Sequence, residues 1–250
     1  TLGCAVSATI ALAGHPYLAF PAAMLAGAAA GFVTALLQTK FRIPSILAGI
    51  ITDTGLYTVN LAVMGFSSNV NLLKKATLFS ELKPMLGTYY RLVPSALIAI
   101  ITVVLLVLFL KTRLGLSIRA TGDNPDMVRA SSINTNFTIT VGLCVANACT
   151  ALSGALLAQY QRTADINLGG GMVIIGLASL IIGEALMPKG KLWMKAAGAV
   201  VGSIVYRFII AIALRLDLPS ECLKLISAVI VALAIGLPAL TNAKGGKVKC

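Results

Sequence analysis

The sequence predicts an all-α fold, a polytopic transmembrane helical bundle, and three observations carry this prediction. Of the 250 residues, 58% are hydrophobic and only 11% are charged, and the mean hydropathy is +0.94. A soluble domain is about a quarter charged, and a core of ordinary size could not hide this much apolar surface. The apolar residues also form long unbroken runs without the alternation of a membrane-spanning strand, which excludes a β-barrel.

The apolar runs give the expected helices in order. A spanning helix needs about 20 mostly apolar residues, because each residue rises about 1.5 Å through a hydrocarbon core of about 30 Å. We expect about eight helices, over residues 2–13, 18–38, 43–64, 92–110, 137–160, 172–187, 196–214 and 222–240. The first run is too short to span a membrane alone, and the chain opens with Thr1 rather than Met. We therefore expect that an N-terminal helix is missing. Residues 1–240 then form one transmembrane domain, and residues 241–250 a basic cytoplasmic tail.

The basic residues predict which helix ends face the cytoplasm. If residues 111–136 are cytoplasmic, alternation also places the N-terminus, residues 38–42, residues 188–195 and the tail on that side. This side then holds twelve of the 20 lysines and arginines, the opposite side seven, and Arg207 lies within a helix. Such a bias is typical of cytoplasmic loops. The net charge of +12 therefore indicates topology and anionic lipid headgroups rather than nucleic acid.

Patterns that support catalysis or metal binding are missing from the sequence. A single histidine excludes an HExxH zinc site, and no Gly-Lys pair is followed by the Ser or Thr of a phosphate-binding loop. The five cysteines have no CxxC spacing, so they indicate neither a zinc site nor a disulfide framework. We expect no catalytic residue, no metal and no cofactor in this chain.

Polar groups within the apolar segments are the candidate substrate-pathway residues. Such groups are costly in a bilayer and by default face the protein interior or a pathway. The candidates are Asp53, Asn60, Asn147 and Glu184. Three roles stay open for them, which are structural pairing of an acid with Arg207, contact with a permeant, and proton relay.

A weak internal repeat suggests two related halves. The matching stretches are residues 26–31 with 197–202, 43–45 with 218–220, and 2–5 with 175–178. The predicted topology runs the first GxxxG helix inward and the second outward, so the repeat would be inverted, as in many transporters. Chance similarity among Gly- and Ala-rich helices is the alternative, and the glycines would allow close helix packing in either case.

The polar stretch at residues 111–136 carries the most information. Asp123 or Asn124 can cap a helix that opens at Pro125, because proline suits the first helical position. Asp126 in the first turn complements the helix dipole. We therefore expect a short helix, over about residues 125–131, at the cytoplasmic membrane face.

This stretch resembles the cytoplasmic coupling loop of ABC importer permeases of the branched-chain amino acid and ribose type. The residues that fit the pattern of that family are Arg119, Ala120, Gly122, Asn124, Pro125, Ala130 and Ile133. Ser132 stands where the family has a second glycine. The run at residues 176–186 resembles a narrower branch of poorly characterised bacterial permeases, some of them linked to tryptophan or other amino acids.

The resemblance implies a permease subunit of an ATP-driven importer that moves a small solute, an amino acid or a related compound, across the bacterial cytoplasmic membrane. The implied partners are an ABC ATPase subunit, which carries ATP hydrolysis, an extracytoplasmic substrate-binding protein, and a second permease subunit, identical or similar. The family also has an inverted repeat, which favours the internal repeat described above. The implied ATPase-coupling residues are Arg119, Gly122, Asn124, Pro125, Asp126 and Arg129.

Two alternatives remain at this stage. An ion-gradient-driven secondary carrier would also be an apolar helical bundle, but the sparse intramembrane acids and the coupling-like loop argue against it. A structural membrane scaffold would transport nothing. The identity of the solute cannot be predicted, because the binding protein carries much of the selectivity of such importers.

Overall fold

The fold is seen in a computed structural model, which describes residues 1–73, 75, 77–187 and 192–215. The chain divides into two compact units, residues 1–168 and residues 169–250. Most of the described residues are helical, which confirms the predicted all-α fold. Among the described residues, five helices are long and apolar enough to cross a membrane. The expected helix at 222–240 and the tail at 241–250 lie outside the described residues, and the single domain over 1–240 stays a prediction.

The described part of the first unit contains eight α-helices, two strands of three residues each and one 3₁₀ turn. In chain order they are α1 (Leu2–Leu12), α2 (Ala19–Thr39), α3 (Ser45–Val63), β1 (Asn69–Asn71), α4 (Leu78–Leu86), the 3₁₀ turn η1 (Gly87–Tyr89), α5 (Leu92–Lys111), α6 (Arg113–Asp123), α7 (Pro125–Ala130), α8 (Thr135–Gln161) and β2 (Thr163–Asp165). The apolar runs predicted α1, α2, α3, α5 and α8 to within two residues at each end. The short elements between them, apart from α7, were not predicted.

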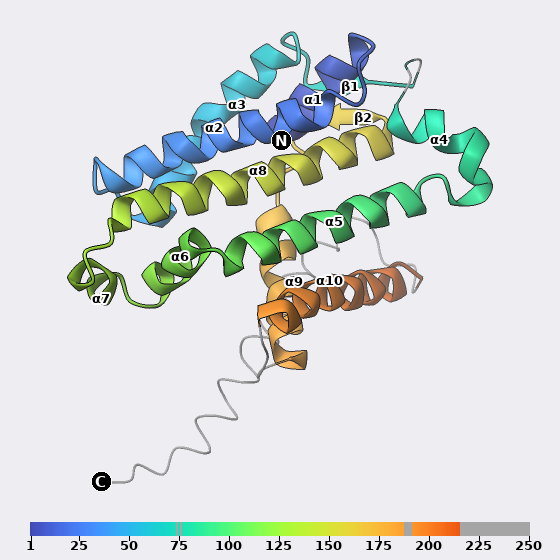
Figure 1. Cartoon of the computed structure of the whole chain (residues 1–250). Coiled ribbons are helices and arrows are strands. Elements are labelled where there is room, and N and C mark those ends of the chain that lie inside the picture. The colour runs from blue at the N-terminus through green and yellow to red at the C-terminus, as the bar shows by residue number, and fades with distance from the viewer. Residues whose placement is uncertain (74, 76, 188–191, 216–250) are drawn as a thin grey trace. The chain divides into compact units, whose positions relative to one another are not determined.

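Helix α8 is the centre of the first unit, and α1 and α2 both pack against it (Figure 1). Close packing requires small residues at the contacts. A Cβ atom added to Gly27 would lie 2.5 Å from the Asn147 carbonyl oxygen, and one on Gly31 would lie 2.6 Å from that of Leu143. Gly27 meets Asn147, and Gly31, which is later in α2, meets Leu143, which is earlier in α8. The two helices are therefore antiparallel. The glycines thus allow backbone contact along the pair.

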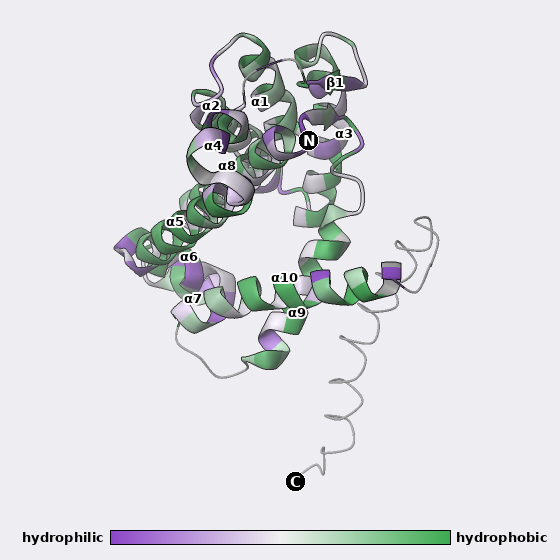
Figure 2. Ribbon diagram, turned by 90° about the vertical axis from the view of Figure 1, so that its right-hand side faces the viewer, coloured by the Kyte–Doolittle hydropathy of each residue, from purple (hydrophilic) through white to green (hydrophobic). Residues whose placement is uncertain are grey.

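The polar elements gather at the two ends of the first unit. One end contains α6, α7 and the start of α8. At the other end, β1 and β2 form an antiparallel ribbon that pairs Asn69 with Asp165, and α4 packs near the end of α8. Figure 2 shows hydrophilic residues at both ends and hydrophobic ones along α5. Leu97, Ile100 and Leu105 on α5 are exposed in the chain alone, as expected of a helix that faces lipid.

The second unit contains α9 (Met172–Leu186) and α10 (Leu192–Arg215), which pack closely on each other. A Cβ atom on Gly198 would lie 3.1 Å from the Gly183 carbonyl oxygen, and one on Gly202 would lie 2.6 Å from the Gly183 nitrogen. A short apolar helix followed by a longer GxxxG helix repeats the order of α1 and α2. The inverted relation of the two halves stays a prediction.

Candidate functional site

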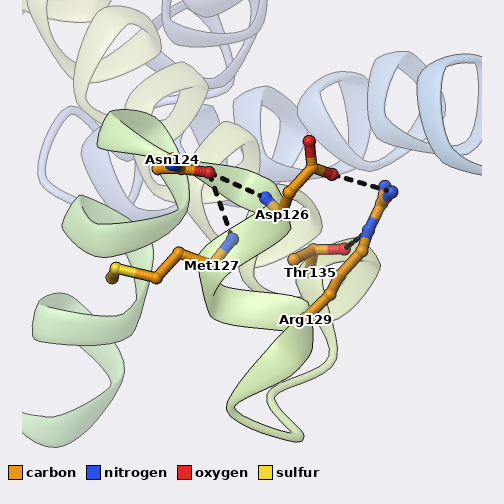
Figure 3. Close-up of polar contacts among 5 residues, drawn as sticks. All are labelled: Asn124, Asp126, Met127, Arg129 and Thr135. Carbon is orange, nitrogen blue, oxygen red and sulfur yellow. Dashed lines mark hydrogen bonds and ion pairs between the residues drawn. The ribbon is translucent and has the colours of Figure 1, made fainter.

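The predicted coupling helix is present as α7, and Asn124 caps it (Figure 3). The Asn124 Oδ1 atom accepts hydrogen bonds from the backbone N–H groups of Asp126 and Met127, both at 3.1 Å. Pro125 occupies the first helical position, where a backbone N–H would have no partner within the helix, so its absence costs no hydrogen bond. Between the two caps that the sequence allowed, the structure selects Asn124, because Asp123 is the last residue of α6.

The six predicted coupling residues lie together at one end of the first unit. Arg119 and Gly122 are exposed on α6, a helix that the sequence analysis treated as loop. Thr112 begins α6 by accepting a hydrogen bond from the Gly115 N–H. All of α7 is exposed except Val128, which is 1% exposed. The structure therefore presents α7 as an exposed helix with one buried side chain, that of Val128.

Arg129 holds α7 against the start of α8. Its Nε atom donates a hydrogen bond to the Thr135 hydroxyl at 3.1 Å, and its guanidinium lies 3.6 Å from the Asp126 carboxylate (Figure 3). The Arg129 side chain is still 63% exposed. The sequence indicated Arg129 as a contact for a partner protein. The structure shows in addition that Arg129 forms a hydrogen bond within the chain, to Thr135. Thr135 was missed because a threonine at a helix start is common and carries no signal alone.

A second polar contact joins α6 to α8. The Thr121 and Thr138 hydroxyls lie 2.9 Å apart and both side chains are buried. One of the two hydroxyls donates to the other, and the proton of the second is left for its own helix, where the Ser117 carbonyl accepts from Thr121 or the Thr135 carbonyl accepts from Thr138. Because buried hydroxyls without partners are costly, this contact favours one arrangement of α6 on α8. Movement of α6 or α7 would therefore be passed to α8.

A groove of about 540 Å³ opens beside α7. Residues from five helices line it, among them Gln38, Ser45, Thr121, Gly122, Pro125 and Thr138. Its walls combine apolar side chains with hydroxyl and amide groups. A groove of this kind can receive side chains of a partner protein that also contacts α7.

The four candidate pathway residues lie on three helices, with Asp53 and Asn60 on α3, Asn147 on α8 and Glu184 on α9. Asp53 is exposed on α3, and Glu184 is exposed on α9 in the second unit. Asn147 on α8 donates to the Leu143 carbonyl at 2.9 Å and faces Gly27 and Gly31 of α2, so its contacts are those of helix packing.

Asn60 on α3 is the most unusual of the four. Its side chain is 2% exposed, and its amide nitrogen donates to the Thr1 hydroxyl at 2.9 Å. In the part of the chain that the structure describes, its Oδ1 atom has no hydrogen-bond partner. Within the described residues, Glu184 and Arg207 form no ion pair with each other, and the pairing of an acid with Arg207 stays a prediction.

Comparisons with known proteins agree with the resemblance of the coupling loop. The family model described as the permease component of the branched-chain amino acid transport system matches residues 1–235. The tyrosine transport system permease protein of Clostridioides difficile is 37% identical over 233 residues, which cover 92% of this chain and 76% of that protein. No solved structure matches the chain.

Two further relatives show the breadth of the group. The uncharacterized protein RP368 of Rickettsia prowazekii is 31% identical over 85% of this chain and 76% of its own length. The ribose import permease protein RbsC of Haemophilus influenzae is 23% identical over 88% of this chain and 67% of its own length. Since the family model covers nearly the whole chain, the chain belongs to the permease family of the branched-chain amino acid transport system, whose members are ABC-type transporter subunits that are not themselves catalytic.

Proposed function

We propose that this chain is the membrane-spanning subunit of an ATP-driven importer in the bacterial cytoplasmic membrane, and that its solute is an amino acid or a related compound. The observation that carries the proposal is α7, a capped and exposed polar helix between two helices of an apolar bundle. A short surface helix held at a fixed position is suited to docking a partner. The family of the chain supports an ATPase as that partner.

The ATPase subunit binds α7 and the groove beside it. Met127 and Asp126 are exposed on α7, while Pro125 and Gly122 belong to the wall of the groove. Arg129 keeps most of its surface accessible in spite of its bond to Thr135. The docking surface thus combines both signs of charge with an apolar side chain, which gives specificity as well as affinity.

Closure of the ATPase would move α7, and two contacts would pass this movement to α8. These are the Arg129–Thr135 hydrogen bond and, through α6, the Thr121–Thr138 contact. Helix α8 is 27 residues long and packs on α1 and α2 along its length. Packed helices move as rigid bodies between discrete arrangements, so a shift at one end can open or close a path elsewhere.

Asp53 is the candidate pathway residue that its position and exposure favour most. It is a carboxylate near the middle of a helix that can cross a membrane, and it is exposed in the chain alone. Leaving such a charge in lipid costs roughly 2.5–3.5 kcal/mol. Contact with a water-filled path or a second permease subunit would avoid this cost. A carboxylate in the path suits the ammonium group of an amino acid, and the tyrosine permease named above supports that class of solute.

The remaining parts of the importer are also proposals. A substrate-binding protein would deliver the solute at the end that contains β1, β2 and α4, since α7 is at the other end. A second permease subunit would complete the pathway. The orientation that the basic residues predict places the β1, β2 and α4 end on the outer side, as delivery by a binding protein requires.

The Arg129→Glu substitution tests ATPase docking. We expect it to lower the amount of ATPase that co-purifies with the detergent-solubilised chain about tenfold, because charge reversal at an interface acts directly on partner affinity. The matched control is Arg113→Glu, which makes the same change of charge at another exposed residue of the polar stretch, outside α7. It should alter co-purification less than about twofold.

Gel filtration of both variants checks that they fold and insert alike. Equal loss of the ATPase in the two variants would show that net charge, not α7, governs association. No loss in either would remove α7 as the docking site.

A further inference from the structure

The end of the first unit opposite to α7 contains a cluster of cations and aromatic rings that the sequence analysis missed. The Lys83 Nζ atom lies 5.9 Å from the ring centre of Tyr90, and the Arg91 guanidinium carbon lies 5.4 Å from the same centre. Arg91 also lies 5.3 Å from the ring centre of Tyr160. These distances are within the range of cation–π attraction. We call Lys83, Tyr90, Arg91 and Tyr160 the outer cluster.

The outer cluster is held in place by buried contacts. Phe79 is buried and meets Tyr160 edge to face, with ring centres 5.8 Å apart, which fixes α4 on the end of α8. The backbone N–H of Leu78 donates to the buried Gln159 side chain at 3.0 Å. Thr77 and Ser80 form a capping box at the start of α4. The positions of the cluster therefore follow from fold contacts and do not depend on a ligand.

Two positive charges lie within cation–π range of one ring in the outer cluster. Glu81, the acid on the same helix, accepts a hydrogen bond from Tyr17. Within the described ranges of the chain, neither Lys83 nor Arg91 forms an ion pair. Like charges that share a site repel each other, and an anion between them removes that repulsion. The outer cluster therefore presents two cations that no carboxylate of the described residues pairs with, and it attracts a negatively charged group.

Apolar side chains next to the outer cluster indicate where that group comes from. Met85 is 83% exposed, Tyr89 is 66% exposed and Leu92 is 63% exposed. Arg91 directly precedes α5, and Tyr160 is in the last turn of α8; both helices can cross a membrane. A surface with cations, aromatic rings and exposed apolar residues at the end of spanning helices is typical of the headgroup region of a bilayer.

From these observations we infer that the outer cluster binds the phosphate of an anionic phospholipid in the outer leaflet. Lys83 and Arg91 take the phosphate, Tyr90 and Tyr160 hold the two cations, and Met85, Tyr89 and Leu92 lie at the level where headgroups meet acyl chains. The site is separate from α7 and does not depend on an ATPase. Its consequence is that α4 and the start of α5 are held at the membrane surface.

Quenching of a tryptophan reporter by brominated lipid tests the inference. The chain carries Tyr89→Trp as the reporter and Trp193→Phe to remove its single native tryptophan, and is reconstituted in phosphatidylcholine vesicles. Brominated phosphatidylglycerol is compared with the same fraction of brominated phosphatidylcholine. We expect phosphatidylglycerol to quench about twofold more strongly, and high salt to reduce this preference.

Two double variants separate charge from residue identity. Lys83→Gln with Arg91→Gln should quench equally with both lipids, whereas Lys83→Arg with Arg91→Lys should keep the preference. The matched control, Lys40→Gln with Arg113→Gln, removes two exposed cations at the α7 end and should also keep it. Equal quenching in the parent chain, or an unchanged preference in the first double variant, would overturn the inference. If that variant fails to fold, the salt dependence and the conservative variant still decide it.

Discussion

At the scale of single residues, Arg129 has two proposed roles that can be separated. Its charge is accessible to a partner, and its Nε atom bonds to Thr135 on α8. Docking should depend on the charge, whereas transmission of movement should depend on the bond. Thr135 is buried, so it can be changed without altering the exposed surface of α7.

We expect the Thr135→Val variant to bind the ATPase within about twofold of the parent chain, since the lost hydrogen bond is worth about 1 kcal/mol and lies away from the docking surface. ATP-driven uptake should fall severalfold, because α7 is less firmly joined to α8. The measurement compares co-purified ATPase with uptake in proteoliposomes. The Thr135→Ser control keeps the hydroxyl and should retain uptake. Loss of binding and of uptake to the same degree would contradict the separation of roles.

Tyr17 gives a pH-dependent contact between the α1–α2 turn and α4. Its hydroxyl donates to the Glu81 carboxylate at 2.5 Å, and this hydrogen bond raises the pKa of Tyr17 above its ordinary value. The bond requires the phenolic proton. Its contribution to stability is therefore fully present below the ordinary pKa of tyrosine, about 10, and is lost as the pH rises through the raised pKa.

We expect the tyrosinate absorbance assigned to Tyr17, obtained by subtracting the titration of Tyr17→Phe, to have its midpoint above the ordinary pKa. Glu81→Gln should move that midpoint back toward the ordinary value, since the carboxylate acceptor is gone. A midpoint that is the same with and without Glu81 would show that the hydrogen bond does not form in solution.

At the scale of elements, the contact of α2 with α8 depends on glycine. Gly27→Ala places a methyl group against the Asn147 carbonyl and the Ala151 side chain, where no space exists. We expect a loss of about 1–3 kcal/mol in the free energy of unfolding, as for other overpacked contacts. Unfolding in mixed detergent and SDS micelles measures it. Gly49→Ala on α3 is the matched control, because no atom lies within 4 Å of the added methyl group. Equal effects of the two substitutions would be incompatible with the packing seen here.

The long helices and the coupling helix could be predicted from the sequence, and the shorter elements could not. Apolar runs define α2 and α5 directly, and Asn124-Pro125 specifies the start of α7 by local geometry alone. The β1–β2 ribbon has three residues in each strand and depends on pairing of segments far apart in the chain. Neither strand is long enough to show an alternating pattern.

The candidate sites differ in the same way. The six coupling residues could be predicted because one continuous stretch of the sequence carries the resemblance that implies them. The outer cluster was missed because Lys83 and Arg91 meet Tyr160 only through the packing of α4 on α8. The role of Asn147 in packing depends on Gly31 of another helix, a contact that no pattern in the sequence shows.

At the scale of the whole molecule, the predicted orientation can be tested on both ends of the first unit. Phe41 and Met127 are exposed near the α7 end, and Met85 is exposed near the opposite end. In a cysteine-free background, we expect Phe41→Cys and Met127→Cys to react with a membrane-impermeant maleimide only after cells are opened. Met85→Cys should react in intact cells. Labelling of Met127→Cys and Met85→Cys from the same side would contradict the topology.

The central claim is that movement of α7 by an ATPase drives solute import. Uptake of a radiolabelled amino acid into proteoliposomes that contain the chain, its ATPase and its binding protein tests this most directly. The account predicts uptake that requires both the ATPase and ATP and that Arg129→Glu abolishes. Uptake by the chain alone under an ion gradient, without ATP, would contradict it and identify a secondary carrier.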